Sequence, residues 1–503
     1  MTLDPEGSEG WDGVLDSLQR RRDVSRGMGG QERLEKHRAA GKLDVRARID
    51  HLLDPGSFQE MGTLVGGEEA PADAVVMGSG RIDGRPVMVA AEDFTVKAGT
   101  ISGSANAKRY RVAEIAVLDR VPCIMVLEGA GFRADGRGHG TRSPVDMLAQ
   151  ARCSGRVPLV TAVCGSSAGH GALVAPISDF SVMSNHAAIF TAGPPVVYES
   201  LGEQITKEDL GGPSVAVPSG LIHNVGADDA ASLDLVRMYL RYFPSSAWSY
   251  PPEYRGDGIG PRPVPELLDI VPRNGRRVYD MRQVVDVVFD AGSCFEVQPD
   301  FGRSVICTLA HLGGHPVAVV ANQPLVLAGS IDADGADKAA HFITVADSFH
   351  LPLVFLADNP GVMPGSASER QGILRSGARM FAAQTQATTP KLEVTFRKAY
   401  GFGSMVMSMV GFDAQSGVFA FPGATMGAMG AAAMSRARQS DEDEAAMLRS
   451  AEVEASYRSA QSFGFDELID PRETRNILLH SLERALYRRQ APAEPVARVG
   501  ITP

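Results

Sequence analysis

An internal repeat is the feature that most constrains how this chain folds. The stretch GRPVMVAAEDFTVKAGTIS, residues 84–102, aligns with GHPVAVVANQPLVLAGSID, residues 314–332, at an offset of 230 residues. The same offset relates Lys108 to Lys338, Pro122 to Pro352 and Gly131 to Gly361. A constant register across roughly fifty residues indicates duplication of a whole domain, because the unit is far longer than a solenoid repeat.

Each copy predicts the same local structure. It begins with an apolar run that predicts a β-strand (86–90 and 316–320) and ends with a second, wholly apolar run (121–127 and 351–357). Between them the pattern predicts an amphipathic helix, whose apolar positions in the second copy are Ala339, Phe342, Ala346 and Phe349. Wholly apolar strands that alternate with helices are typical of a sheet covered on its faces, so the predicted class is α/β.

The length and the composition predict two globular domains. The 503 residues exceed what one hydrophobic core usually holds, and the stretch 243–276 is dense in proline and glycine. We place the boundary within it and predict domains at 1–258 and 259–503. Apolar residues make up 44% of the chain and charged residues 22%, with no apolar stretch long enough to span a membrane. The acidic N-terminus is unlike a secretory signal, so we expect a soluble, cytoplasmic protein.

Several classes of site are disfavoured by the same reasoning. The five cysteines are odd in number and never spaced as C-x-x-C, which argues against a disulfide framework or a thiolate zinc site. We therefore predict no metal in this chain. A net charge of -11 argues against a nucleic-acid partner. The Arg20, Arg21 and Arg22 cluster is read as a solvated helix face or as a contact for an anionic ligand.

The stretch GSSAG, residues 165–169, fits the G-x-S-x-G pattern of a serine nucleophile, with Ser167 at the serine position. The repeat favours another interpretation. With two inserted residues the offset becomes 232, so Ser167 aligns with Ala399, and the turn 169–171 aligns with 401–403. What the halves share is a strand that runs into a glycine turn, where backbone N–H groups can hold an oxyanion. Two such turns indicate two oxygen atoms that carry charge in the transition state.

Longer stretches of the chain resemble one enzyme family, from about residue 30 to residue 489. These stretches are KLDVRARIDHLLDPGSFQEMG from Lys42, EDFTVKAGTISGSANAK from Glu92, ITKEDLGG from Ile205, YDMRQVVDVVFDAGSCFEVQPDFG from Tyr279, NPGVMPGSASERQGILRSGARM from Asn359, TPKLEVTFRKAYGFGSMVM from Thr389 and MGAMGAAA from Met426. The sequence resembles the carboxyltransferase (β) subunits of biotin-dependent acyl-CoA carboxylases, of the propionyl-CoA and methylcrotonyl-CoA carboxylase group, in the crotonase superfamily.

The resemblance implies a fold, a reaction and an assembly. The fold is two tandem crotonase-type (ββα spiral) domains related by internal duplication, the N-terminal one on the acyl-CoA side and the C-terminal one on the biotin side. Carboxybiotin supplies carbon dioxide, biotin takes the α-proton, and the thioester enolate attacks the carbon dioxide, so no protein base is required. The carboxyl group goes to the α- or γ-carbon of an acyl-CoA, and the resemblance favours a short-chain one such as propionyl-CoA. The active site then lies at a dimer interface, within a homo-hexamer or a hetero-oligomer with related β subunits.

The resemblance also implies site residues. The turn formed by Gly169, His170 and Gly171 serves the thioester oxygen, and Phe402 with Gly403 serves the ureido oxygen of biotin. The residues implied for the acyl-CoA are Ser102, Gly103, Lys108, Gly131, Arg133 and Met405. Those implied for the biotin side are Gly361, Tyr400, Gly401 and Gly427.

The chain departs from the family pattern at both turns. It reads AGHG and YGFG where relatives have AGG and YGGA, so His170 and Phe402 stand at glycine positions, and EGAGFR followed by ADGRGHGTR (134–142) replaces the usual DSGGAR. Both replacements keep a backbone N–H but need backbone angles that a side chain tolerates. His170 either lines the wall and gives only its N–H or transfers a proton.

Two omissions imply a partner. The chain has no A-M-K-M-like biotinylation segment and no ATP-binding G-x-x-x-x-G-K-[ST] loop. Biotin must therefore arrive on a biotin carboxylase and biotin carrier (α) subunit. Three other readings stay open at this point: a β-like scaffold subunit without catalytic activity, a decarboxylase or transcarboxylase of the same fold, and a serine hydrolase that uses Ser167.

Overall fold

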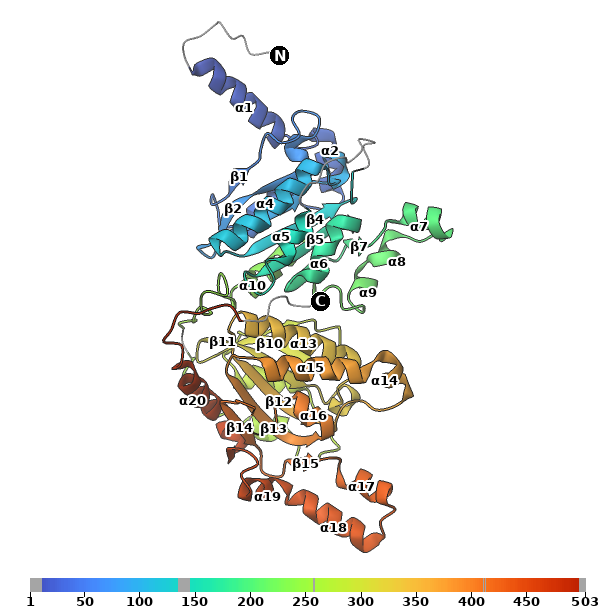
Figure 1. Ribbon diagram of the computed structural model, residues 1–503, viewed down its shortest axis with the longest axis vertical. Coiled ribbons are helices and arrows are strands. Elements are labelled where there is room, and N and C mark those ends of the chain that lie inside the picture. Colours follow the sequence, from blue (N-terminus) through green and yellow to red (C-terminus); the bar gives the residue numbers. More distant parts are fainter. Residues whose placement is uncertain (1–10, 134–144, 257, 410, 412, 497–503) are drawn as a thin grey trace. The chain divides into compact units, whose positions relative to one another are not determined.

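The computed structural model describes residues 11–133, 145–256, 258–409, 411 and 413–496 (Figure 1). The chain forms two compact units, the first made of residues 1–216 and 225–237 and the second of residues 217–224 and 238–503. These units divide near residue 237, whereas the division into an acyl-CoA side and a biotin side at 258/259 stays a prediction. The glycine-rich stretch 134–142 lies outside the described residues.

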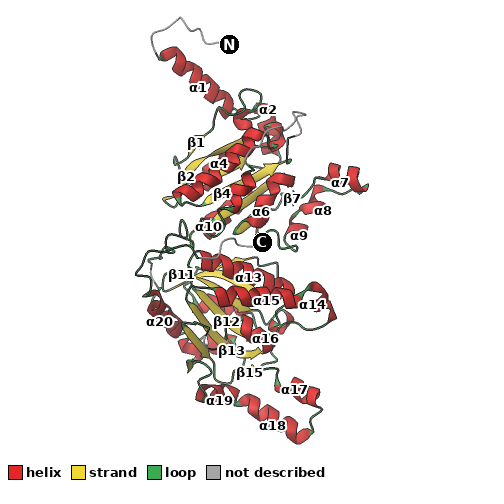
Figure 2. Ribbon diagram, viewed as in Figure 1, coloured by secondary structure: helices red, strands yellow, loops and turns green. Residues whose placement is uncertain are grey.

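The first unit is built on an eight-stranded sheet (Figure 2). The strands run in the order β1-β2-β3-β4-β5-β6-β8, and β7 pairs with the end of β5. The first two pairings are antiparallel, while β3, β4, β5 and β6 run parallel. The strands are β1 (Gln59–Met61), β2 (Val75–Ile82), β3 (Arg85–Glu92), β4 (Cys123–Gly129), β5 (Leu159–Ala168), β6 (Phe180–Ser184), β7 (Ala188–Phe190) and β8 (Asn224–Gly226).

The second unit repeats this sheet. Its order is β9-β10-β11-β12-β13-β14-β16, with β15 paired to the end of β13. The strands are β9 (Phe295–Val297), β10 (Val305–Leu312), β11 (His315–Asn322), β12 (Leu353–Asn359), β13 (Lys391–Tyr400), β14 (Gly417–Ala420), β15 (Thr425–Gly427) and β16 (Glu467–Leu468). The predicted α/β class and the duplicated crotonase-type domains are therefore confirmed.

Helices accompany each sheet. Those of the first unit are α1 (Asp12–Arg26), α2 (Gln31–Ala39), α3 (Val45–Leu52), α4 (Gly103–Asp119), α5 (Asp146–Ala151), α6 (Val174–Ile177), α7 (Pro194–Leu201), α8 (Lys207–Gly211), α9 (Pro213–Ala216) and α10 (Asp229–Leu240). Those of the second are α11 (Leu267–Ile270), α12 (Met281–Val288), α13 (Ala333–Ser348), α14 (Ser366–Gln371), α15 (Ile373–Gln386), α16 (Gly401–Val406), α17 (Ala431–Arg438), α18 (Glu442–Val453), α19 (Ala455–Gln461) and α20 (Thr474–Leu486). No helix of the described residues is long and apolar enough to cross a membrane.

The strand registers match the sequence repeat residue by residue. Met88 pairs with Cys123 in the first sheet, and Ala318 pairs with Leu353 in the second, both shifted by 230. The next pairing, Cys123 with Leu159, becomes Leu353 with Lys391, which carries the two inserted residues. Both sheets also shift register at the same place, after Leu127 and after Ala357. The duplication thus extends to irregularities of the backbone.

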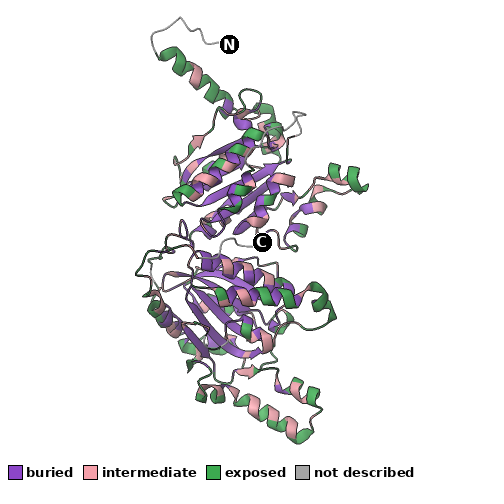
Figure 3. Ribbon diagram, viewed as in Figure 1, coloured by how far each residue is buried: buried purple, intermediate pink, exposed green. Residues whose placement is uncertain are grey.

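Burial explains why these segments form strands and helices. Every residue of β4 and β12 is buried, as their uninterrupted apolar runs predict (Figure 3). The helices after the β3 and β11 turns begin at polar caps: Ser102 accepts N–H bonds from α4, and Asp332 accepts one from α13. The predicted apolar positions of α13 are all buried. Each sheet therefore carries its strand ends, and the turns that follow them, on a rigid core.

Candidate active site at two glycine turns

Two glycine turns occupy equivalent places in the two sheets. In the first unit β5 ends at Ala168, and Gly169 has a φ of +58°. In the second, β13 ends at Tyr400, and Gly401 has a φ of +54°. Side chains rarely tolerate such angles, so the chain needs glycine at both positions. Each turn leads into a short helical segment, η3 (Gly169–Leu173) or α16, as the repeat predicts.

The third residue of each turn is glycine because of close packing. A Cβ on Gly403 would overlap Asn359 Oδ1 and lie 2.7 Å from Gly361 Cα, which no side chain could accept. A Cβ on Gly171 would lie 3.1 Å from Glu92 Oε1. The middle residues, His170 and Phe402, have no positive φ. The bulky residues at the family's glycine positions therefore leave the backbone of both turns unstrained.

Ser167 does not form a nucleophile elbow. It lies inside β5, paired with Gly129, and its side chain is fully buried. Its hydroxyl has no hydrogen-bond partner among the described residues. A serine nucleophile must be exposed at a sharp turn and face its base. The structure therefore removes the physical basis of the serine hydrolase reading.

Buried charged side chains contact the first turn and one another. Arg109 of α4 is fully buried and donates to Asp146 Oδ2 at 2.6 Å, to Glu92 Oε1 at 2.5 Å and to the Gly171 carbonyl at 3.3 Å. The Nε2 atom of His170 forms a short hydrogen bond with Asp146 Oδ1. A hydrogen bond from His170 to Asp146 and the ion pairs of Arg109 thus connect His170 to Glu92 and fix the turn between them.

The two carboxylates of this cluster have opposite pKa shifts. Burial alone would raise the pKa of Asp146, but the hydrogen bond from His170 and the charge of Arg109 outweigh it and lower the pKa to about 2. Burial raises the pKa of Glu92, and the charge of Arg109 offsets this only in part. The difference arises because Asp146 faces both His170 and Arg109. Asp146 is therefore ionised at neutral pH.

A second buried charge cluster adjoins the first. The Glu92 carboxylate also accepts the backbone N–H of Glu128 at 2.9 Å. The Glu128 carboxylate in turn contacts Lys42 at 2.5 Å and Arg48 at 2.6 Å. Arg48 continues to Asp229 at 2.9 Å. Ionic contacts thus hold the ends of β3 and β4.

The second turn is supported by amides instead. Asn322, which aligns with Glu92, accepts the Asp358 N–H and the Asn359 side-chain N–H, each at 3.1 Å. The side-chain oxygen of Asn359, Oδ1, accepts the Gly361 N–H at 3.1 Å. Asp358 accepts hydrogen bonds from Tyr279 at 2.9 Å and from Arg397 at 2.7 Å. The two turns therefore share a backbone geometry but differ in their electrostatic surroundings.

The predicted biotin-side residues lie together. Tyr400 pairs with Gly427 between β13 and β15, and a Cβ on Gly361 would lie 3.5 Å from the Tyr400 carbonyl oxygen. The Tyr400 hydroxyl contacts Thr425 at 2.7 Å and donates to Glu452 of α18 at 2.5 Å. Burial and the neighbouring Glu452 raise the pKa of Tyr400. The structure thus gathers Gly361, Tyr400 and Gly427 around the second turn.

Most of the predicted acyl-CoA residues gather around the first turn. Ser102 caps α4 ahead of Gly103 and donates to Asp73, and Arg133 pairs with the same carboxylate at 2.5 Å. A Cβ on Gly131 would lie 3.1 Å from the Ala168 carbonyl oxygen, directly before the turn. In the second unit, Met405 lies on α16, and 43% of its surface is exposed. The Arg20–Arg22 cluster lies exposed on α1.

Lys108 is directed to buried backbone carbonyls. It is only 4% exposed, and its ammonium group donates to the carbonyls of Gly62, Ala72 and Val75. Burial lowers its pKa to about 8. Lys338, its counterpart in the repeat, is likewise buried and bonds two carbonyls. The two lysines thus share a structural setting, in which each ammonium group holds buried backbone carbonyls.

Replacing Lys108 by methionine tests that setting. We expect Lys108→Met to lower the free energy of unfolding by about 1–3 kcal/mol, because buried carbonyls lose their donor. Denaturant unfolding of the variant and the wild type measures the difference. A variant with unchanged stability and a raised KM for acyl-CoA would instead place Lys108 at the substrate.

Sequence reasoning missed the residues that support the turns. Arg109, Asp146 and Glu92 are far apart in sequence and match no motif. One signal was available: Glu92 aligns with Asn322, so the two halves differ in charge where strand β3 or β11 ends. Asp146, the buried hydrogen-bond partner of His170, has no such signal.

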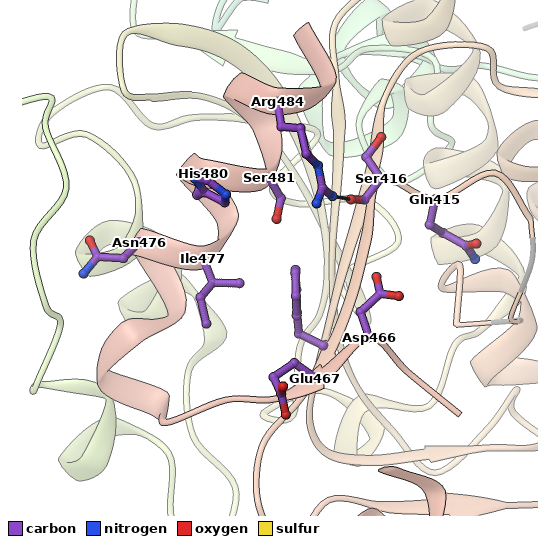
Figure 4. A pocket seen from close by; sticks show the side chains of 10 residues that line it. Gln415, Ser416, Asp466, Glu467, Asn476, Ile477, His480, Ser481 and Arg484 are labelled. Atoms are coloured by element: carbon purple, nitrogen blue, oxygen red, sulfur yellow. Dashed lines mark hydrogen bonds between the residues drawn. The ribbon is translucent and has the colours of Figure 1, made fainter. Parts of the chain in front are cut away.

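A separate pocket of about 670 Å³ lies in the second unit (Figure 4). Asp466 and Glu467, at the edge of the sheet, face His480 and Arg484 of α20, and Arg484 donates to the Ser416 carbonyl. Neither glycine turn contributes a residue to its lining. Within the described part of the chain, no group of three or more His, Cys, Asp or Glu side chains could hold a metal ion.

Comparisons with known proteins bear on the whole chain. The family model described as a carboxyl transferase domain matches residues 36–496. The methylmalonyl-CoA carboxyltransferase 12S subunit of Propionibacterium freudenreichii subsp. shermanii is 35% identical and is matched over 95% of each chain. The mitochondrial propionyl-CoA carboxylase beta chain of Homo sapiens is 34% identical over 89% of this chain and 86% of the human protein.

A solved structure agrees with these relatives. The crystal structure of transcarboxylase 12S, described as a hexamer assembly with methylmalonyl-coenzyme A and methylmalonic acid bound, has a TM-score of 0.90. It is 33% identical and covers 98% of this chain and 100% of its own. The duplicated fold, the paired turns and the extent of these matches lead to one conclusion. The chain belongs to the carboxyl transferase family and is a carboxyltransferase subunit of the biotin-dependent acyl-CoA carboxylases.

Proposed function

We propose that this subunit moves a carboxyl group from carboxybiotin, carried on a separate α subunit, to the α-carbon of a short-chain acyl-CoA such as propionyl-CoA. The observation that carries the proposal is the pair of equivalent glycine turns, one at the end of β5 and one at the end of β13. Related proteins whose names include propionyl-CoA or methylmalonyl-CoA support the choice of substrate.

The first turn is proposed to hold the thioester oxygen. The backbone N–H groups around His170 and Gly171 are the donors, and charge on the oxygen grows as the α-proton leaves. Ser102, Gly103 and Arg133 stand beside this turn, at the start of α4 and after β4, where the CoA chain would pass. Arg109 holds the Gly171 carbonyl in place, which fixes the adjoining donors.

The second turn is proposed to hold the ureido oxygen of biotin. The packing around Gly403 supports this role. Asn359 and Gly361 lie so close to Gly403 that its N–H donor is fixed in position. The Tyr400 hydroxyl is anchored by a hydrogen bond to Glu452. Bound carboxybiotin supplies the carbon dioxide. The residues of this chain bind and orient: Phe402 and Gly403 offer N–H groups, and Gly427 keeps side chains away from the strand end.

The assembly follows from the need to bring the two turns to one reaction. We propose a homo-hexamer, or a hetero-oligomer with related β subunits, in which the first turn of one copy meets the second turn of another in the cytoplasm. The relative described as a hexamer assembly supports this arrangement. Because biotin is expected on another chain, a biotin carboxylase and carrier subunit is the proposed partner.

An acyl-CoA panel tests the proposed function. The purified chain is combined with a biotinylated α subunit, ATP and ¹⁴C-bicarbonate, and acetyl-, propionyl-, butyryl- and methylcrotonyl-CoA are compared for labelled product. We expect labelling with at least one short-chain ester and the highest kcat/KM for propionyl-CoA. Absence of labelled product with every ester, under conditions in which the α subunit carboxylates its own biotin, would contradict the proposal.

A further inference from the structure

His170 is held by a carboxylate in the manner of a general base. Its Nε2 atom bonds Asp146, which is fully buried, whereas 26% of the His170 side chain is exposed. An ionised carboxylate only accepts hydrogen bonds, so the imidazole donates through Nε2. A neutral ring then keeps its lone pair on Nδ1, the ring nitrogen nearest the main chain. An imidazole fixed in one tautomer by a buried carboxylate is arranged for proton transfer.

The carboxylate is itself held on every side. Arg109 and Gln150 both donate to Asp146 Oδ2, at 2.6 and 3.0 Å, which leaves Oδ1 to His170. The backbone N–H of Asp146 donates to Asn106 Oδ1 at 3.0 Å. Three groups thus bind the Asp146 carboxylate and a fourth binds its backbone N–H, and the imidazole cannot turn without losing a buried hydrogen bond. Within the described chain, the one hydrogen bond recorded for the ring is that through Nε2.

The second turn shows that this arrangement is not a general requirement of the fold. Phe402 takes the place of His170, and its ring lies 6.0 Å from that of Phe381. The position that aligns with Asp146 is Ser376, whose hydroxyl donates to Asp337. A turn that only offers backbone N–H groups is therefore complete without a histidine and its carboxylate. The pair at the first turn needs an explanation of its own.

Covalent geometry places this base beside the bond it would break. The His170 main-chain nitrogen and its Nδ1 are separated by four bonds, so both belong to one small region of the turn. In a thioester the carbonyl oxygen and the α-carbon are separated by two bonds. An acyl-CoA whose oxygen accepts the His170 N–H therefore has its α-carbon within reach of the side chain of the same residue.

We propose that His170, positioned by Asp146, removes the α-proton of an acyl-CoA bound at the first turn, so that the chain enolises its substrate without biotin. This inference rests on the proposed function, since it takes the acyl-CoA as ligand of this turn. The α C–H bond breaks, its proton goes to His170 Nδ1, and its electron pair forms the enolate, whose negative oxygen is held by the turn. Return of a proton from the imidazole to the α-carbon restores the thioester. In heavy water the proton on Nδ1 first exchanges with the solvent, so a deuteron returns to the α-carbon.

The test measures exchange by the full-length chain alone. Propionyl-CoA is incubated with the chain in heavy water, without α subunit, biotin or bicarbonate, and deuterium at the α-carbon is followed by mass spectrometry. We expect the gain of one deuteron at the α-carbon, faster than in buffer. His170→Phe and His170→Ala should each slow the exchange by about 100-fold or more, the usual contribution of a general base.

Matched variants separate the chemistry from folding. His170→Phe recreates the side chain that the second turn already accommodates, so circular dichroism and sedimentation should match the wild type. Asp146→Asn keeps the size of the side chain but no longer requires the Nε2-protonated tautomer, and it should slow exchange while acyl-CoA still binds. Ser167→Ala, inside β5 and away from the imidazole contacts, should exchange at the wild-type rate.

The outcomes separate this inference from the proposed function. No exchange above buffer by the wild type, or undiminished exchange by both His170 variants, overturns the inference. Carboxyl transfer with an α subunit but without exchange also overturns it, and leaves the proposed function in place. Exchange without carboxyl transfer to any ester supports the inference and overturns the proposed function.

Discussion

Replacing Gly169 by proline is expected to abolish carboxyl transfer, with kcat reduced by at least roughly 10²–10³-fold. Proline locks φ near −65°, whereas Gly169 has a φ of +58°, so the turn cannot keep its shape. Loss of even one oxyanion donor costs this much in other enzymes. Steady-state carboxylation with saturating acyl-CoA, and sedimentation to confirm assembly, provide the measurement.

The second turn should respond in the same way. Gly403→Pro removes the proposed donor outright, and its ring atoms would overlap Asn359 and Gly361. Ser167→Ala is the matched control, because its hydroxyl is buried without a described partner and its removal costs little. Strong loss of activity in Ser167→Ala, or normal kcat in either proline variant, would contradict the role given to the turns.

Arg109→Met is expected to destabilise the fold by about 3–5 kcal/mol. The substitution leaves Glu92 and Asp146 buried without the cation that pairs with both, which is the costly way to break a buried ion pair. Urea unfolding followed by circular dichroism measures the change. Activity should fall as well, because Gly171 loses the contact to its carbonyl.

Arg111→Met is the control for this variant. Arg111 lies on the same helix, but it and its partner Glu114 are exposed, so the loss should stay within about 1 kcal/mol. Equal effects of the two substitutions would mean that the buried cluster contributes no more than a surface pair. Adding Glu92→Gln and Asp146→Asn to Arg109→Met should recover part of the stability, since no unpaired charge then remains.

The fold was predictable because the two copies of the domain share the same spacing of apolar runs and glycines. The offsets of 230 and 232 residues in the sequence also relate the paired residues of the two sheets. This agreement is expected because burial of both faces of a strand fixes which residues it can pair with. Element ends were less well predicted: the run 121–127 became a strand that begins at Cys123 and extends to Gly129.

The turns were predictable, but their supports were not. Gly169 and Gly401 stand out in the alignment of the halves because backbone shape demands glycine. Arg109, Asp146 and Glu92 come together only when α4, α5 and β3 pack, and pairing across such distances leaves no local pattern. Lys108, which the resemblance implies for the acyl-CoA, donates to buried backbone carbonyls, and no local pattern in the sequence indicates this contact.

The central claim, that the two turns together move a carboxyl group between an acyl-CoA and biotin, is tested most directly by the reverse reaction of the purified chain. Malonyl-, methylmalonyl- and ethylmalonyl-CoA labelled in the free carboxyl are incubated with and without free biotin, and labelled carbon dioxide is counted after acidification. We predict release that rises with biotin concentration and is lost in both Gly169→Pro and Gly403→Pro. Release that is absent or independent of biotin with all three esters, from a chain that binds them, would contradict the account.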